Sequence, residues 1–128
     1  IFFRELSNIP DTIVALKESF YVDTSTQLDR EWQEWLIAWR KLVIQDGNQE
    51  EISKKMKQVN PKYTWREWLV VPAYEQAQRG DYSLVKELQE VLSHPYEEQS
   101  QAIEEKYYRL KPEAFFNAGG VSHYSCSS

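Results

Sequence analysis

The sequence has 128 residues, of which 41% are hydrophobic and 14% aromatic, and its formal net charge is -5 at pH 7. This content predicts one compact domain with an apolar core, because two independent domains would each be small for a core of their own. The negative net charge argues against nucleic-acid and anionic-membrane partners, which need clustered Lys and Arg, and no apolar run approaches the length that spans a bilayer.

Helices are predicted throughout the chain, because apolar residues recur at spacings of three and four and glycine is scarce. A short first helix should meet a second at the junction Ser7–Pro10, and the second should run to about Tyr21. Thr24, Ser25 and Thr26 are possible N-caps of a long third helix, and Gln27 stands in capping-box register with Thr24. Gly47 is the expected stop of this helix.

The long third helix has two contrasting faces. The apolar face consists of Leu28, Trp32, Trp35, Leu36, Trp39, Leu42 and Val43. The opposite, charged face consists of Asp29, Arg30, Glu34, Arg40 and Lys41. We interpret the tryptophans as a buried seam, and the alternative is a surface that grips a ligand or a partner peptide.

A fourth helix should begin at Asn48 and end at the turn Asn60-Pro61-Lys62-Tyr63, since the residue before proline is pushed out of helical geometry. Within this turn we expect Asn60 to bond its own backbone and Tyr63 to pack inward. The structural interpretation is that the turn locks a helix corner. The functional alternative assigns a role to Lys62 and Tyr63.

The remaining helices follow similar signals. Thr64 and Glu67 form another capping box, and Pro72 should kink or break that helix near Val71. A further helix should lie between Gly80-Asp81 and His94-Pro95, and a weaker one around Ala102–Tyr108. The predicted fold is therefore a mainly α, irregular bundle of about five to seven helices over residues 1–112, followed by an irregular tail over residues 113–128.

Other ionisable clusters carry weaker signals. The acidic pairs are Glu50-Glu51, Glu97-Glu98 and Glu104-Glu105, and we interpret them as solvated helix faces rather than acid-base pairs. Lys54-Lys55-Met56-Lys57 is the one basic cluster, for which a helix exterior is the default. Cys126, His123 and the distant His94 fall short of a closed zinc shell, so no metal site is predicted.

A family resemblance rests on residues spread over nearly the whole chain. They are Phe2-Phe3-Arg4, Leu6-Ser7, Asn60-Pro61-Lys62-Tyr63, Arg66, Leu69, Ala77, Gly80-Asp81, Leu88, Leu92, Pro95-Tyr96 and Cys126-Ser127-Ser128. In combination they resemble the C-terminal region of the selenoprotein O family, in a cysteine-containing form. Two segments depart from the family pattern: Thr64-Trp65 with Val70-Val71-Pro72, and Lys111-Pro112-Glu113.

The resemblance implies that the chain is the C-terminal part of a larger kinase-like protein that uses ATP and magnesium to transfer AMP to Ser, Thr or Tyr of protein substrates. Such chemistry needs a phosphate-binding lysine and metal-binding Asn and Asp side chains, and the sequence offers no such set. The catalytic residues are therefore expected before Ile1, the chain alone should be inactive and should bind no cofactor, and its partner should be the kinase-like part of the same protein. The family occurs in bacterial cytoplasm, which we favour, and in mitochondria.

Cys126 is the only cysteine in the sequence. At the equivalent position many animal members of the family carry selenocysteine, and the resemblance implies that this residue pairs with a cysteine of the catalytic part and links activity to redox state. Without the resemblance, an unreactive thiol would be the simpler interpretation. The leading hypothesis is thus a helical scaffold and redox-regulatory segment. A free-standing helical protein-interaction module is the alternative, and an independent thiol oxidoreductase is the weakest candidate.

Overall fold

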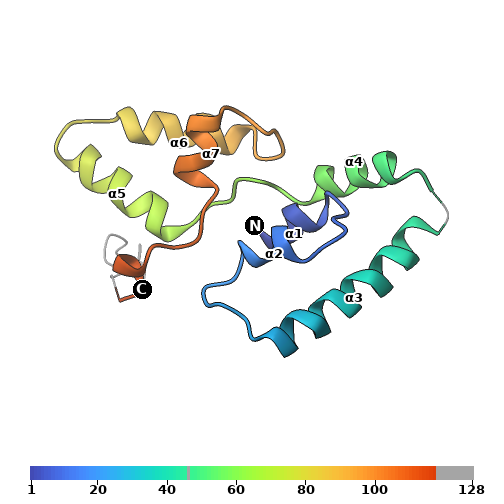
Figure 1. Cartoon of the computed structure of the whole chain (residues 1–128). Helices are drawn as coiled ribbons and strands as arrows, with labels where there is room; N and C mark the ends of the chain where they lie inside the picture. The colour runs from blue at the N-terminus through green and yellow to red at the C-terminus, as the bar shows by residue number, and fades with distance from the viewer. Residues whose placement is uncertain (46, 118–128) are drawn as a thin grey trace, which may run out of the picture. The chain divides into compact units, whose positions relative to one another are not determined.

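The structure is a computed structural model, and it describes residues 1–45 and 47–117. Within these residues it contains seven α-helices, one 3-10 helix and no strand, which confirms the mainly α prediction. The chain divides into two compact units, residues 1–62 and 63–128, here called the N-terminal and C-terminal units (Figure 1). This division does not bear on the boundary at residue 112, which stays a prediction.

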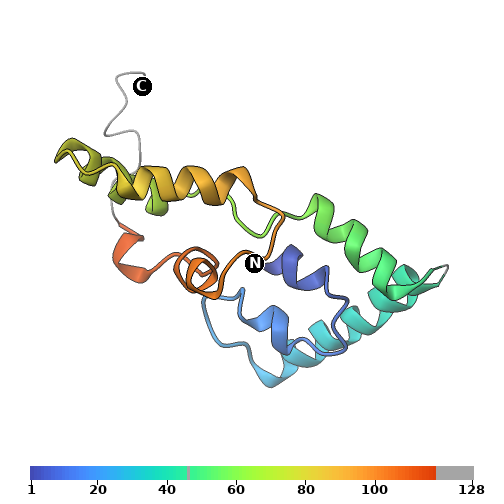
Figure 2. The ribbon, with the colours of Figure 1, turned by 90° about the horizontal axis from the view of Figure 1, so that it is seen from above.

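The N-terminal unit is built around one long helix. Its elements are α1 (Phe2–Leu6), α2 (Val14–Lys17), α3 (Thr26–Ile44) and α4 (Gln49–Val59). In both ribbon views α3 and α4 run away from and back toward the short helices α1 and α2, so that they form a helical hairpin (Figures 1 and 2). Leu6, Ile13, Leu16 and Leu36 form the buried core of this unit, and Leu16 and Leu36 are fully buried.

An aromatic cluster extends that core. The ring centroid of Phe2 lies 5.7 Å from that of Trp32 and 6.4 Å from that of Trp35, and Phe20 lies 5.6 Å from Trp32. Trp32 and Trp39 pack against the buried core, which confirms a seam at these two positions. Trp35 is different, because 40% of it is exposed.

Local capping sets the helix starts of this unit. The Ser25 hydroxyl accepts a hydrogen bond from the backbone N–H of Leu28 at 3.2 Å, so Ser25 is the one of the three candidates that caps α3. The Asn48 side chain caps α4 as predicted, by accepting from the N–H of Glu50 at 2.9 Å. The predicted second helix is wrong in length: α2 covers only Val14–Lys17, because the segment before it is held by side chains of α3 instead of by helical hydrogen bonds.

The C-terminal unit has a core of its own. Its elements are α5 (Glu67–Gln78), α6 (Ser83–Ser93), α7 (Gln101–Tyr107) and the 3-10 helix η1 (Glu113–Phe115). The turn between the contacting helices α5 and α6 contains Gly80 at a φ of 89°, a left-handed conformation that glycine adopts without steric cost. Tyr63, Ala73, Leu88, Val91 and Tyr107 form the buried core.

Helix α5 departs from two predictions. It begins at Glu67 after Arg66, with no side-chain cap, so Thr64 does not start it. Pro72 lies inside α5 without breaking it. Proline removes one backbone hydrogen bond, but Val70 and Ala73 on either side of it are buried, and their packing holds the helix in place.

Candidate functional site

The predicted turn at residues 60–63 begins in a buried polar cluster of the N-terminal unit. Arg4 is only 4% exposed, and its Nη1 donates to the carbonyl oxygens of Lys57, at 3.0 Å, and of Asn60, at 3.2 Å. A cation at the C-terminus of α4 is favourable, because the last carbonyls of a helix have no partner within the helix and carry partial negative charge. Arg4 therefore caps α4 from α1.

The side chain of Asn60 joins the same cluster. Its Nδ2 donates to the hydroxyl of Ser7 at 3.0 Å, and that hydroxyl donates to the carbonyl of Phe3 at 2.7 Å. Ser7 is fully buried. The observed partner of the Asn60 amide thus lies 53 residues earlier in the chain, rather than in the turn itself as expected.

The other residues of the turn are also buried. Lys62, in the N-terminal unit, is 7% exposed, and Tyr63, in the C-terminal unit, is 2% exposed. Tyr63 donates its N–H to the carbonyl of Pro95, at 3.1 Å, and its hydroxyl to the carbonyl of Glu98, at 2.7 Å. Buried polar groups with satisfied hydrogen bonds fit a structural anchor. The structural role predicted for Asn60, Pro61, Lys62 and Tyr63 stays a prediction, as does the functional alternative for Lys62 and Tyr63.

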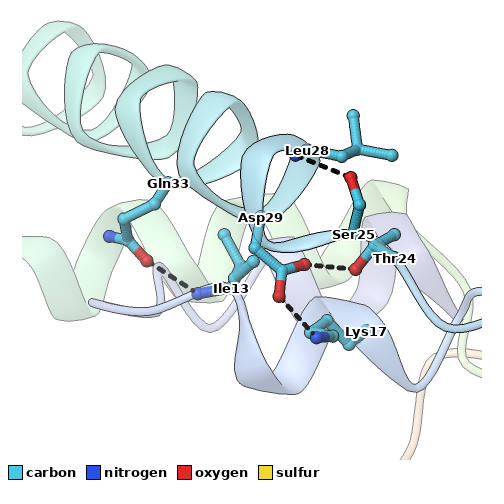
Figure 3. Close-up of polar contacts among 7 residues, drawn as sticks. All are labelled: Ile13, Lys17, Thr24, Ser25, Leu28, Asp29 and Gln33. Atoms are coloured by element: carbon cyan, nitrogen blue, oxygen red, sulfur yellow. Dashed lines mark hydrogen bonds and ion pairs between the residues drawn. The ribbon is translucent and has the colours of Figure 1, made fainter.

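Polar side chains of α3 bind the segment that precedes it, as Figure 3 shows. Gln33 accepts from the N–H of Ile13 at 3.1 Å, and Asp29 forms an ion pair with Lys17 at 2.8 Å and accepts from the Thr24 hydroxyl. The Lys17 ammonium is the larger cause, and the Thr24 hydroxyl the smaller, of a lowered pKa of Asp29.

Arg40 continues this polar stripe of α3. It donates to the carbonyl of Ile9 and pairs with Asp11 at 2.7 Å. Ile9 has a φ of 50°, which is rare for a β-branched residue, so these contacts hold a strained turn. Asp29 and Arg40, both on the charged face of α3, thus bind backbone or side chains of residues 9–24.

Glu87, Lys106 and Tyr107 form an ionisable cluster in the C-terminal unit. Glu87 accepts hydrogen bonds from Lys106 and Tyr107. Lys106 first, and Tyr107 second, lower the pKa of Glu87. Burial first, and Glu87 second, raise the pKa of Tyr107. Both groups are thus held in one protonation state near neutral pH, which is typical of a structural cluster and unlike an acid-base pair that must exchange protons.

Within the part of the chain that the structure describes, no three His, Cys, Asp or Glu side chains gather as metal ligands would. His94, on the C-terminal side of α6, lies near Glu90, with 3.5 Å between Nδ1 and Oε1. Cys126 and His123 lie outside the described residues. The search for a membrane span, made over the described residues, found no helix with the required length and apolar character.

Comparison with known proteins places these helices in a family. Residues 1–93 match the family model described as "Protein adenylyltransferase SelO". Proteins called "Protein nucleotidyltransferase YdiU" are similar to the chain: that of Aromatoleum aromaticum is 34% identical over 135 residues, and that of Pseudomonas aeruginosa is 36% identical over 130 residues. Each comparison covers 100% of this chain but only 25% and 24% of the relatives.

A third relative, from Tolumonas auensis, carries the same name and is 35% identical over 134 residues, covering 100% of this chain and 25% of its own length. No solved structure matches the chain. The chain thus spans about a quarter of the length of the curated relatives that it matches. Since the family model covers residues 1–93, well over half of the sequence, the chain belongs to the SelO family of protein adenylyltransferases.

Proposed function

We propose that this chain is the C-terminal helical scaffold of a protein adenylyltransferase, and that the residues which bind ATP and magnesium lie in a part of the protein outside it. The observation that carries the proposal is that the whole chain matches about a quarter of the length of proteins named nucleotidyltransferases. The all-helical structure of the described residues fits a scaffold.

The proposed role of the chain is mechanical. Arg4 and Arg40 fasten short segments of the N-terminal unit to its two long helices, and Tyr63 fastens the start of the C-terminal unit to the segment after α6. Charge-assisted hydrogen bonds from guanidinium groups are stronger than neutral ones and fix geometry. Such anchors would give the catalytic part a rigid surface to pack against.

The test is AMP transfer from ATP to a protein acceptor, measured with magnesium present. Three proteins are compared: the complete adenylyltransferase that contains this chain, the same protein lacking residues 1–128, and the chain alone. We expect transfer by the complete protein and none by the chain. Transfer by the chain alone would contradict the proposal, as would an unimpaired truncated protein.

We further propose that Cys126 gives this scaffold a redox role. It is the only thiol of the chain, so an intramolecular disulfide would join it to a cysteine of the catalytic part. In that reaction the two thiols lose two protons and two electrons, and oxidised glutathione is the oxidant class that takes them up by thiol–disulfide exchange.

The redox proposal is tested on the complete protein incubated with oxidised or reduced glutathione. Mass spectrometry of peptides from the unreduced protein should identify a disulfide at Cys126, and AMP transfer should differ between the two conditions. Cys126→Ser should abolish both effects, whereas the neighbouring Ser125→Ala should change neither. A glutathione response that persists in Cys126→Ser would contradict the role of this thiol.

A further inference from the structure

Three large apolar side chains on α3 are exposed along one line. Leu28 and Trp35 are each 40% exposed, and Leu42 is 72% exposed. They are spaced by seven residues, and seven residues are close to two helical turns, so the three side chains drift by only about 20° at each step. We call these three residues the Leu28–Leu42 line.

The N-terminal unit covers only the other edge of this apolar stripe. Leu36 is fully buried, and Trp32 and Trp39 pack against the core. At about 100° per residue, Leu36 is rotated about 80° around the helix axis from Leu28. Trp35 and Leu42 are rotated from Leu28 in the other direction, by about 20° and about 40°. The apolar stripe of α3 is therefore wider than the surface that α1, α2 and α4 cover.

Aromatic rings continue the exposed surface beyond α3. Phe2 lies 6.4 Å from Trp35 between ring centroids, and Phe3 packs edge-on against Phe2 at 5.5 Å. Phe3 itself is 67% exposed. Contiguous exposed apolar surface on a protein marks an interaction site, whereas a single exposed apolar residue such as Ile37, on the far side of α3, needs no explanation.

The shape of the line fits a helix as its partner. From Leu28 to Leu42 the rise is about 21 Å, at about 1.5 Å per residue. Apolar residues that repeat every seven positions are the pattern with which one helix packs along another. A polar edge borders the line, where Gln27 donates to Glu31 at 3.2 Å. An amphipathic helix of about four turns, with basic residues facing Glu31, would cover this surface.

We propose that the Leu28–Leu42 line is the docking surface for an amphipathic helix that belongs to the part of the adenylyltransferase outside this chain. The inference rests on the proposed function. The argument for this occupant is the length of the relatives: the chain covers 24 to 25% of them, so about three quarters of such a protein lies outside the matched region and can supply the helix. Burying a leucine contributes enough free energy to change a binding constant by about tenfold or more.

The first test is hydroxyl-radical footprinting read by mass spectrometry, on the chain alone and on the complete adenylyltransferase. We expect Trp35 and Leu42 to be oxidised severalfold less in the complete protein, while Ile37, which is 57% exposed on the far side of α3, is oxidised equally in both. Equal oxidation of Leu42 in the two proteins would overturn the inference.

The second test compares Leu42→Glu with the matched control Ile37→Glu, which places the same charge on the same helix. In the chain alone, both variants should melt like the wild type, because both side chains are largely exposed. In the complete protein, only Leu42→Glu should lower the melting temperature. Equal effects of the two variants there would overturn the inference.

Size-exclusion chromatography separates the remaining occupants. A chain that is dimeric, and becomes monomeric in Leu42→Glu, would assign the line to a second copy and overturn the inference. A chain that remains monomeric but loses stability through Leu42→Glu would assign the line to its own C-terminal unit, with the same consequence. Neither result touches the proposed function, which is measured separately as AMP transfer by the complete protein.

Discussion

Each of the two units of the chain is stabilised internally by a different kind of side-chain contact. In the N-terminal unit, guanidinium groups bind backbone carbonyls: Arg4 binds those of Lys57 and Asn60, and Arg40 binds that of Ile9. In the C-terminal unit, the hydroxyl of the buried Tyr63 binds the carbonyl of Glu98, and the one guanidinium contact of this kind among the described hydrogen bonds, from Arg109 to the carbonyl of Lys106, is exposed. The guanidinium group keeps its charge at any pH a protein tolerates, while a phenol can ionise. The units should therefore differ in the size of their anchoring contacts and in their response to pH.

The largest effect is expected from Arg4→Met, which keeps much of the apolar stem but removes the buried charge. Two carbonyls, of Lys57 and Asn60, would lose their donor. Hydrogen bonds to charged groups contribute about 1.5–3 kcal/mol each, and buried acceptors without a donor add a penalty, so we expect a loss of about 3 kcal/mol in the free energy of unfolding. Urea denaturation measures it.

The matched control for this change is Arg30→Met, because Arg30 lies exposed on α3 of the same unit. It should alter the free energy of unfolding by less than about 0.5 kcal/mol. Equal losses of unfolding free energy in the two variants would show that the Arg4 cluster stabilises the fold no more than an exposed arginine does. Guanidinium contacts would then not distinguish the N-terminal unit from the C-terminal unit.

A smaller effect is expected from Tyr63→Phe, the corresponding change in the C-terminal unit. It removes a neutral hydrogen bond of 2.7 Å from a side chain that is 2% exposed. We expect a loss of about 1 kcal/mol, because neutral hydrogen bonds contribute less than charge-assisted ones. Tyr82→Phe, at a tyrosine that is 57% exposed, should be close to neutral. A loss from Tyr63→Phe as large as that from Arg4→Met would contradict the ranking.

Helix caps offer a matched pair, one in each unit. Ser25 accepts from the N–H of Leu28 at 3.2 Å, and Ser100 accepts from the N–H of Ile103 at 3.3 Å. Replacing either serine by alanine should cost about 1 kcal/mol. If the two units unfold independently, the double variant should show two separate unfolding transitions, each with its free energy of unfolding lowered by the loss of one cap, about 1 kcal/mol. A single transition lowered by the sum of the two would show that the units unfold together.

The sequence predicts these local features well, because their signals lie within one turn of helix. Asn48 caps α4 as predicted, α6 ends before His94-Pro95, and α7 coincides with the expected weak helix to within one residue at each end. The cap of α3 could be narrowed only to Thr24, Ser25 and Thr26, since three consecutive hydroxyl residues can all accept from the first turn and local sequence does not rank them; the structure selects Ser25.

Long-range contacts could not be predicted in this way. Arg4 meets the carbonyl of Lys57 across 53 positions, and nothing near Arg4 in the sequence distinguishes it from a solvated arginine. The polar stripe of α3 is a similar case, because the helical spacing that places Asp29 and Arg40 on the charged face does not name their partners Lys17 and Asp11. The one available signal is the proline and asparagine content of residues 8–11, which excludes a regular helix there and leaves backbone groups that need partners. Cys126, the candidate redox residue, lies outside the described residues and stays a prediction.

The smallest effect, and the sharpest contrast between the units, is expected at alkaline pH. Acid does not separate them, because Asp29 in one unit and Glu87 in the other both have a lowered pKa, so each stabilises the fold at neutral pH and loses this contribution as pH falls below about 4. Tyr107 has a raised pKa, caused by burial and then by Glu87. Its contribution is complete below the unfolded value of about 10 and is lost as pH rises further. The stability difference between wild type and Tyr107→Phe should therefore be constant up to about pH 10 and shrink above it in urea titrations. A difference that stays constant above about pH 10 would mean that burial and the Glu87 contact do not hold the phenol proton of Tyr107. The C-terminal unit would then lack the alkaline pH response that separates it from the N-terminal unit.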